Sequence, residues 1–136
     1  MDFTIEFHHI GVACRDIEQT AAAYEGLGYR RGETVFDPIQ RVNICFLTHE
    51  SMPCVELLEP ADAQSPVVQT IEKNGTAPYH VCYAVDNLDE TLRSLRKQRY
   101  IVAVKPQIAC AIGGRRVVFL YKPEMGLIEL VEKQKI

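Results

Sequence analysis

The chain has 136 residues, which suffice for one domain or for two half-size modules that share a core. A hydrophobic fraction of 47% and a charged fraction of 24% are typical of a folded globular protein and exclude extensive disorder. The net charge of −3 gives no reason to expect a nucleic acid or a membrane surface as partner, and no apolar run approaches the roughly 20 residues that span a bilayer.

The first half of the chain predicts the element order β-α-β-β-β. A strand over residues 6–14 leads to a helix that Asp16 can cap, with Gln19 three residues further on. The apolar side of this helix follows an i, i+4, i+7 stripe formed by Ile17, Ala21 and Tyr24. Three more strands are expected near residues 30–36, 42–48 and 54–58.

The second half predicts the same order after a connector over residues 60–78. Within the connector, Ser65-Pro66 begins a short helix and Asn74-Gly75 ends it. A strand over residues 79–85 then leads to a helix that Asn87 caps, with the stripe Leu88, Leu92 and Leu95. The remaining strands are expected near residues 101–104, 116–121 and 126–131. We therefore predict an α+β protein, a single domain over residues 1–136, with βαβββ modules at about 6–59 and 79–132.

A short repeated pattern connects the two halves. Residues 9–20 read HIGVACRDIEQT and residues 80–91 read HVCYAVDNLDET, at an offset of 80 − 9 = 71. Further on, VEL at residues 55–57 is echoed by IEL at residues 128–130, at an offset of 129 − 56 = 73. Each copy contributes one histidine and one glutamate, and such a duplicated module can close around a single metal ion.

Four residues are therefore candidate metal ligands: His9, Glu56, His80 and Glu129. Each glutamate stands between apolar neighbours on a strand, where an unpaired charge costs several kcal/mol. Two imidazoles and two carboxylates form a nitrogen and oxygen donor set for a divalent ion. We expect His8 to point to the other face of its strand and His49 to be solvated in a polar loop.

These segments resemble the vicinal oxygen chelate superfamily, also called the glyoxalase fold. The similar stretches are HHIGVA at 8–13, VELLEP at 55–60 followed by Ser65-Pro66, YHVCYAVD at 79–86, and VVFL at 117–120 leading to GLIEL at 126–130. The closest branch is the methylmalonyl-CoA epimerases. The resemblance implies two βαβββ modules in one cupped mixed sheet around a divalent metal, and its metal ligands fall on the four candidate residues.

The resemblance implies an enzyme that removes the proton α to a thioester carbonyl, with Glu129 as one base and with Glu56 or an unidentified group opposite it. Lactoylglutathione lyase shares the four-ligand pattern and is the alternative. An Fe(II) extradiol dioxygenase uses two histidines and one glutamate, so the additional Glu56 counts against it. A non-catalytic ligand-binding member of the fold typically lacks the metal ligands.

The sequence also departs from the epimerase pattern. Asn43 stands where some epimerases carry a second acid-base glutamate, and an amide cannot accept a proton as a carboxylate does. We place Asn43 among the expected substrate-binding residues. Arg115 and Arg116 are the other two, because they follow Gly113-Gly114 and such a loop can approach the phosphates of a CoA substrate.

The expected cofactor is one divalent metal ion, with Co²⁺, Ni²⁺, Mn²⁺, Zn²⁺ and Mg²⁺ all compatible with these ligands. The expected partners are a small acyl thioester and, by resemblance, a second copy of the chain in a homodimer. Five cysteines without a CxxC pair indicate reduced thiols, and the first residues lack the pattern of a signal peptide. We therefore expect a cytoplasmic protein.

Overall fold

The structure is a computed structural model that describes residues 4–134, with eight β-strands, three α-helices and one short 3₁₀ turn. These elements divide into two compact units. The first unit comprises residues 9–79, and the second comprises residues 80–134 together with residues 4–8. None of the helices within residues 4–134 is long and apolar enough to cross a membrane.

The first unit contains a mixed sheet in the order β2-β3-β4-β1. Strand β1 pairs with β4 in parallel, and the β2–β3 and β3–β4 pairs are antiparallel. The elements are β1 (Ile5–Ala13), α1 (Ile17–Glu25), β2 (Arg30–Asp37), β3 (Val42–Thr48), β4 (Val55–Pro60) and α2 (Val67–Asn74). Helix α2 is the connector helix that the sequence predicts.

The second unit repeats this topology in the order β5-β8-β7-β6. Strand β5 pairs with β8 in parallel, and the other two pairs are antiparallel. The elements are β5 (Ala77–Val85), α3 (Leu88–Lys97), β6 (Ile101–Ala109), the 3₁₀ turn η1 (Cys110–Ile112), β7 (Arg115–Lys122) and β8 (Gly126–Glu132). The predicted α+β class with two βαβββ modules is thus confirmed.

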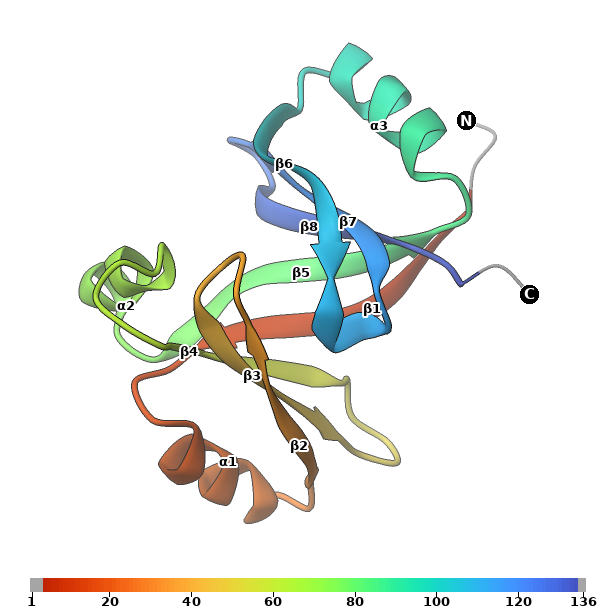
Figure 1. Ribbon diagram of the computed structural model, residues 1–136. Helices are drawn as coiled ribbons and strands as arrows, with labels where there is room; N and C mark the ends of the chain where they lie inside the picture. Colours follow the sequence, from red (N-terminus) through yellow and green to blue (C-terminus); the bar gives the residue numbers. More distant parts are fainter. Residues whose placement is uncertain (1–3, 135–136) are drawn as a thin grey trace. The chain divides into compact units, whose positions relative to one another are not determined.

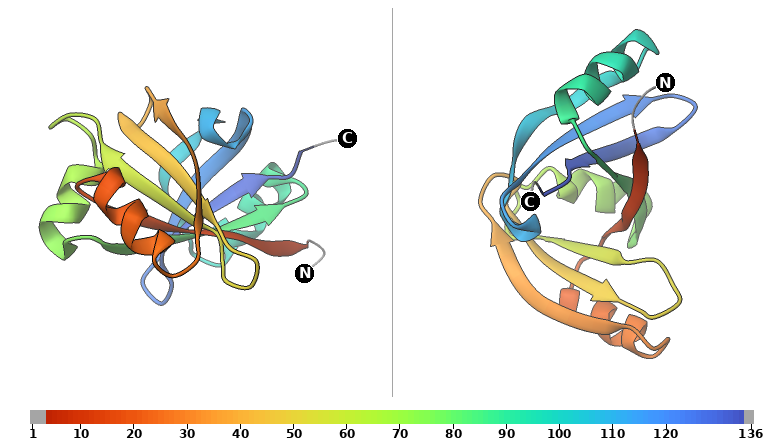
Figure 2. Two further views of the ribbon diagram at one scale, coloured as in Figure 1. Left: turned by 90° about the horizontal axis from the view of Figure 1, so that it is seen from below. Right: turned by 90° about the vertical axis from the view of Figure 1, so that its right-hand side faces the viewer.

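Each long helix packs against one face of the sheet in its own unit (Figures 1 and 2). We call this the helix face and the opposite one the ligand face. In the first unit, α1 buries Ile17 and Ala21 against Val12 and Leu57. In the second unit, α3 buries Leu88 and Leu95 in a cluster with Val85, Val118, Leu120, Ile128 and Leu130.

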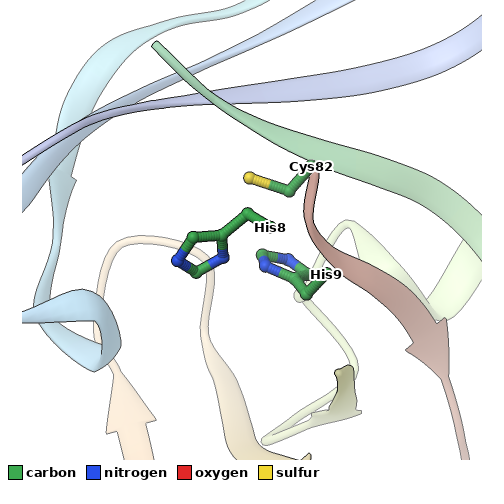
Figure 3. Close-up of side chains that lie close together, drawn as sticks. All are labelled: His8, His9 and Cys82. Carbon is green, nitrogen blue, oxygen red and sulfur yellow. The ribbon is translucent and has the colours of Figure 1, made fainter. Parts of the chain in front are cut away.

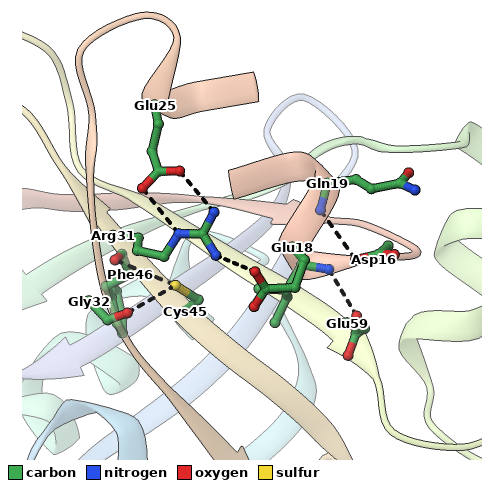
Figure 4. Close-up of polar contacts among 10 residues, drawn as sticks. Asp16, Glu18, Gln19, Glu25, Arg31, Gly32, Cys45, Phe46 and Glu59 are labelled. Atoms are coloured by element: carbon green, nitrogen blue, oxygen red, sulfur yellow. Dashed lines mark hydrogen bonds and ion pairs between the residues drawn. The ribbon is translucent and has the colours of Figure 1, made fainter. Parts of the chain in front are cut away.

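Helices α1 and α3 each begin with two side-chain acceptors, one just before the helix and one from the end of a strand. Asp16 caps α1 by accepting a hydrogen bond from the Gln19 N–H at 3.2 Å, as predicted, and Glu59 accepts from the Ile17 N–H at 2.8 Å (Figure 4). These contacts satisfy two of the backbone donors that a helix leaves open at its start.

In the second unit, Asn87 accepts from the Glu90 N–H at 3.0 Å, and Glu132 accepts from the Leu88 N–H at 3.0 Å. The local caps were predicted from sequence. Glu59 and Glu132, which reach the helices from the ends of β4 and β8, were not; we call them the cap glutamates.

Strand β6 is longer than predicted, because it continues past Val104 to Ala109. The added part contains Pro106, which has no N–H to donate to a neighbouring strand. In the structure β6 pairs only with β7 within its unit and its register shifts between Val104 and Gln107, so Pro106 lies on an edge strand that tolerates it.

Candidate metal-binding pairs

The first pair consists of His9 on β1 and Glu56 on β4. Gly11 lies opposite Glu56 in the parallel register, and His9 is two residues before Gly11, so both side chains stand on the ligand face. His9 Nε2 and Glu56 Oε1 are 3.2 Å apart, and the two residues are 0% and 4% exposed.

The second pair repeats this arrangement with His80 on β5 and Glu129 on β8. Cys82 lies opposite Glu129, and His80 is two residues before Cys82. His80 Nε2 and Glu129 Oε1 are also 3.2 Å apart, and both residues are 3% exposed. The repeat found in the sequence therefore corresponds to the same local geometry in each unit.

The chemistry of these donors fits a divalent ion. A buried carboxylate needs a cationic partner, either a protonated imidazole or a metal. Two ligands at right angles on one ion, each at about 2.1 Å, stand about 3.0 Å apart. The 3.2 Å separation within each pair therefore suits two neighbouring ligands of the same ion.

Each histidine also packs against a phenylalanine. The Phe46 ring meets His9 edge to face with ring centroids 5.3 Å apart, and Phe119 meets His80 in the same way at 5.2 Å. Phe46 lies opposite Glu56 on the neighbouring strand, and Phe119 lies opposite Glu129. Each phenylalanine thus contacts the histidine and stands beside the glutamate of one pair.

Asn43 and Arg116 lie on the helix face, which differs from the substrate-binding role expected for them. Asn43 Nδ2 donates to Glu59 Oε1 at 3.1 Å, and Asn43 is the third residue before Phe46 on β3. Because strand side chains alternate, Asn43 faces α1 and away from Glu56. It supports a cap glutamate.

Arg116 occupies the equivalent place in the second unit. Its guanidinium donates to Asp89 at 2.8 and 3.3 Å and lies 3.8 Å from Glu132. The offset 116 − 43 = 73 equals the offset between the two ligand glutamates. Both residues therefore hold a cap glutamate, and neither is assigned to a substrate.

Arg115 points to the ligand face of β7, as the expected substrate contact requires. Its Nε donates to the Ile112 carbonyl at 3.1 Å, and one terminal nitrogen lies 3.2 Å from His8 Nε2. The expectation that His8 points to the other face is wrong, because it contacts Arg115 and has a ring nitrogen within 4.8 Å of the sulfur of Cys82, which lies opposite Glu129 (Figure 3).

His49 differs from its expected solvated state. Its Nδ1 accepts from the Ser51 N–H at 3.1 Å, its Nε2 lies 3.2 Å from the Leu27 carbonyl, and its ring packs on Tyr29. It connects the β3–β4 loop to the end of α1.

Burial, and secondly the charge of Glu56, raise the pKa of the Cys54 thiol, which keeps this neighbour of Glu56 protonated.

Comparison with known proteins identifies the family. Residues 8–119 match the family model described as the glyoxalase/bleomycin resistance protein/dioxygenase superfamily. The chain belongs to this superfamily. This match includes three of the four candidate ligands, since Glu129 follows its end.

Relatives within the glyoxalase superfamily include epimerases. The chain is 30% identical to human mitochondrial methylmalonyl-CoA epimerase over 127 residues, covering 90% of this chain and 71% of that protein. It is 32% identical over 129 residues to the uncharacterized protein YqjC of Bacillus subtilis, covering 91% and 89% of the two chains. A variant of Streptomyces coelicolor methylmalonyl-CoA epimerase, solved with 2-nitronate-propionyl-CoA, has a TM-score of 0.80 and 26% identity, with 96% of this chain and 98% of that chain covered.

Sequence reasoning about this glyoxalase-superfamily chain missed Phe46 and Phe119. Their offset of 119 − 46 = 73 is that of the two ligand glutamates. The same repeat that selected the glutamates, extended to the preceding strands, would have found the phenylalanines.

Proposed function

We propose that this chain is a metal-dependent epimerase or isomerase that removes the proton α to a thioester carbonyl, as a methylmalonyl-CoA epimerase does. The observation that carries this proposal is the buried His–Glu pair that occurs once in each unit with the same 3.2 Å separation. The similarity to the human and Streptomyces proteins, which are named methylmalonyl-CoA epimerases, supports the proposal that the substrate of this chain is a thioester.

We propose that both pairs bind one divalent ion, with His9, Glu56, His80 and Glu129 as its ligands. Two imidazole nitrogens and two carboxylates are compatible with Co²⁺, Ni²⁺, Mn²⁺, Zn²⁺ or Mg²⁺. When bound, such an ion acts as a Lewis acid toward the negative charge that develops on substrate oxygens, an effect worth several kcal/mol.

The two ligand glutamates are also the proposed acid-base residues. Glu129 accepts the α-proton, and the electron pair of the broken C–H bond delocalises into the thioester carbonyl as an enolate. Glu56 returns a proton to the opposite face of the same carbon, which inverts its configuration; it can do so only when it is protonated and not acting as a ligand, because a ligating carboxylate carries no proton. Phe46 and Phe119 supply apolar walls that keep water from the histidines they contact.

The reaction is tested by following deuterium at the α-carbon of methylmalonyl-CoA in D₂O, with the buffer rate subtracted. We expect exchange that depends on added divalent metal and that falls at least about a hundredfold in Glu129→Gln. Glu72→Gln, on the exposed side of α2, is the matched control and should stay within about twofold of the wild type. Absence of metal-dependent exchange in the wild-type protein would rule out the proposal.

The shared ion is tested separately by its stoichiometry. The wild-type chain should hold one ion, and either His9→Ala or His80→Ala should weaken binding by about ten- to a hundredfold or more. His49→Ala, whose ring binds the β3–β4 loop, should keep the ion. Two ions in the wild type, with one retained in each histidine variant, would show that the pairs bind metal independently.

Lactoylglutathione lyase activity is separated from this function by the hemithioacetal of methylglyoxal and glutathione. We expect no turnover of this compound at a protein concentration that exchanges methylmalonyl-CoA. Turnover of the hemithioacetal without thioester exchange would transfer the assignment to the lyase.

A further inference from the structure

Arg115 is a partly buried arginine whose contacts include no carboxylate. Three arginines are intermediate in exposure, and two of them, Arg31 and Arg116, have carboxylate partners at 2.6–2.8 Å. Within residues 4–134, no carboxylate lies within ion-pair distance of Arg115. Its partners are the Ile112 carbonyl and the His8 ring.

These two partners tether the guanidinium, and neither of them is a carboxylate. A guanidinium has five N–H donors and no acceptor, so His8 Nε2 accepts this hydrogen bond. The contacts involve Nε and one terminal nitrogen, so other N–H groups are left for a ligand. A planar donor fork that is tethered in place binds a carboxylate in two parallel hydrogen bonds.

The position of Arg115 on β7 places it on the same face as Glu129. Phe119 lies opposite Glu129. Val117 and Arg115 stand two and four residues before Phe119 on β7, so their side chains point to the same ligand face. Arg115 is about 13 Å along the strand from Phe119 at about 3.3 Å per residue. Its side chain reaches back toward that position, because one terminal nitrogen lies 3.2 Å from His8 Nε2 and a His8 ring nitrogen lies within 4.8 Å of the sulfur of Cys82, the residue opposite Glu129.

The geometry points to a ligand within a short acyl group. We propose, resting on the proposed function, that Arg115 binds a carboxylate of the acyl moiety and thereby selects carboxyacyl thioesters over uncharged ones. A phosphate of CoA is the other oxyanion that could approach this arginine, but it is more than about 12 Å from the thioester by bond lengths.

The test measures dissociation constants by calorimetry, together with KM for proton exchange, in Arg115→Met and in the control Arg30→Met. Arg30 is an exposed arginine at the start of β2, so its loss should change no constant more than about twofold. Three ligands are compared: methylmalonyl-CoA, propionyl-CoA, which has no carboxylate, and methylmalonyl-pantetheine, which has no phosphates.

We expect Arg115→Met to weaken both methylmalonyl thioesters by about ten- to a hundredfold and to leave propionyl-CoA within about twofold. Equal weakening of both CoA esters with methylmalonyl-pantetheine unchanged would assign Arg115 to a phosphate and overturn the proposal. Unchanged binding of all three would overturn it as well.

Failure of the proposed function has a different signature. In that case the wild-type protein exchanges no α-proton, yet the calorimetric comparison still reports whether Arg115 prefers the carboxylated ligand. A wild-type protein that binds neither CoA ester would overturn both proposals. Thermal melting of each variant confirms that it is folded before its constants are compared.

Discussion

Phe46 and Phe119 set the surroundings of the two histidines at the level of single residues. Each ring meets an imidazole nearly at right angles, with interplanar angles of 85° and 86°. Edge-to-face packing of this kind restricts the orientation of the imidazole, and groups that orient a metal-binding histidine influence its affinity.

We therefore predict that Phe46→Leu or Phe119→Leu lowers metal affinity by about tenfold, because the imidazole loses its packed orientation. Phe36→Leu, at a ring that is 53% exposed on β2, is the control and should not change the affinity. Isothermal titration with Co²⁺ or Mn²⁺ measures the effect. Equal affinities in all three variants would mean that the aromatic contact does not orient the histidine.

The five thiols differ in reactivity for the same local reasons. Burial raises the pKa of Cys14 to about 11, whereas Cys110 is exposed at the η1 turn. Because the thiolate is the reactive form, an aromatic disulfide reagent at pH 8 should label Cys110 rapidly and Cys14 only after unfolding. Mass spectrometry of the labelled peptides identifies the order, and early labelling of Cys14 would contradict the buried environment.

At the scale of elements, the cap glutamates join each helix to the end of a strand. Replacing Glu59 with methionine leaves the Ile17 N–H and the Asn43 amide without this acceptor. We expect Glu59→Met and Glu132→Met each to lower the free energy of unfolding by about 1–2 kcal/mol. Glu72→Met on α2 should stay within about 0.5 kcal/mol of the wild type.

Urea unfolding measures these changes. Metal affinity provides a second readout, because the cap glutamates face the helices while Glu56 and Glu129 face the other way. The metal affinity of Glu59→Met and of Glu132→Met should differ from that of the wild type by less than about threefold, because both substitutions are distant from the proposed ligands. A large loss of metal affinity without loss of stability would place these residues in the metal site instead.

The elements show why some features were predictable and others were not. The caps at Asp16 and Asn87 follow from spacing within a few residues, and so do the buried stripes of the two helices. The helix-facing position of Asn43 also follows from counting along β3, and the analogy with an acid-base position obscured it. The contact of Arg115 with His8 joins residues 107 positions apart, and no local pattern carries it.

For the whole molecule, metal binding should be linked to unfolding. An ion that binds only the folded state adds about 2.7 kcal/mol when its free concentration is 100 times Kd. We expect excess chelator to lower the midpoint of thermal unfolding by several degrees, because a protein of this size shifts by a few degrees per kcal/mol. Calorimetric scans with and without chelator measure the shift.

His9→Ala should abolish this shift, since the proposed ion needs ligands from both units. A shift of half the size in His9→Ala would instead indicate that His80 and Glu129 hold an ion by themselves. The repeated pairs were predictable because each unit carries its own copy of the pattern.

Strands β4 and β8 each carry one candidate metal ligand and one cap glutamate. The two glutamates are separated by Leu57-Leu58 in β4 and by Leu130-Val131 in β8. Because the separation is odd, one carboxylate points to the ligand face and the other reaches a helix start. Inserting or deleting a single residue between them would turn both carboxylates to one face of the sheet, so that either the metal ligand or the helix cap would be lost. The length of this spacer is therefore constrained more tightly than its composition, and divergence here should proceed by substitution and never by a single-codon gain or loss.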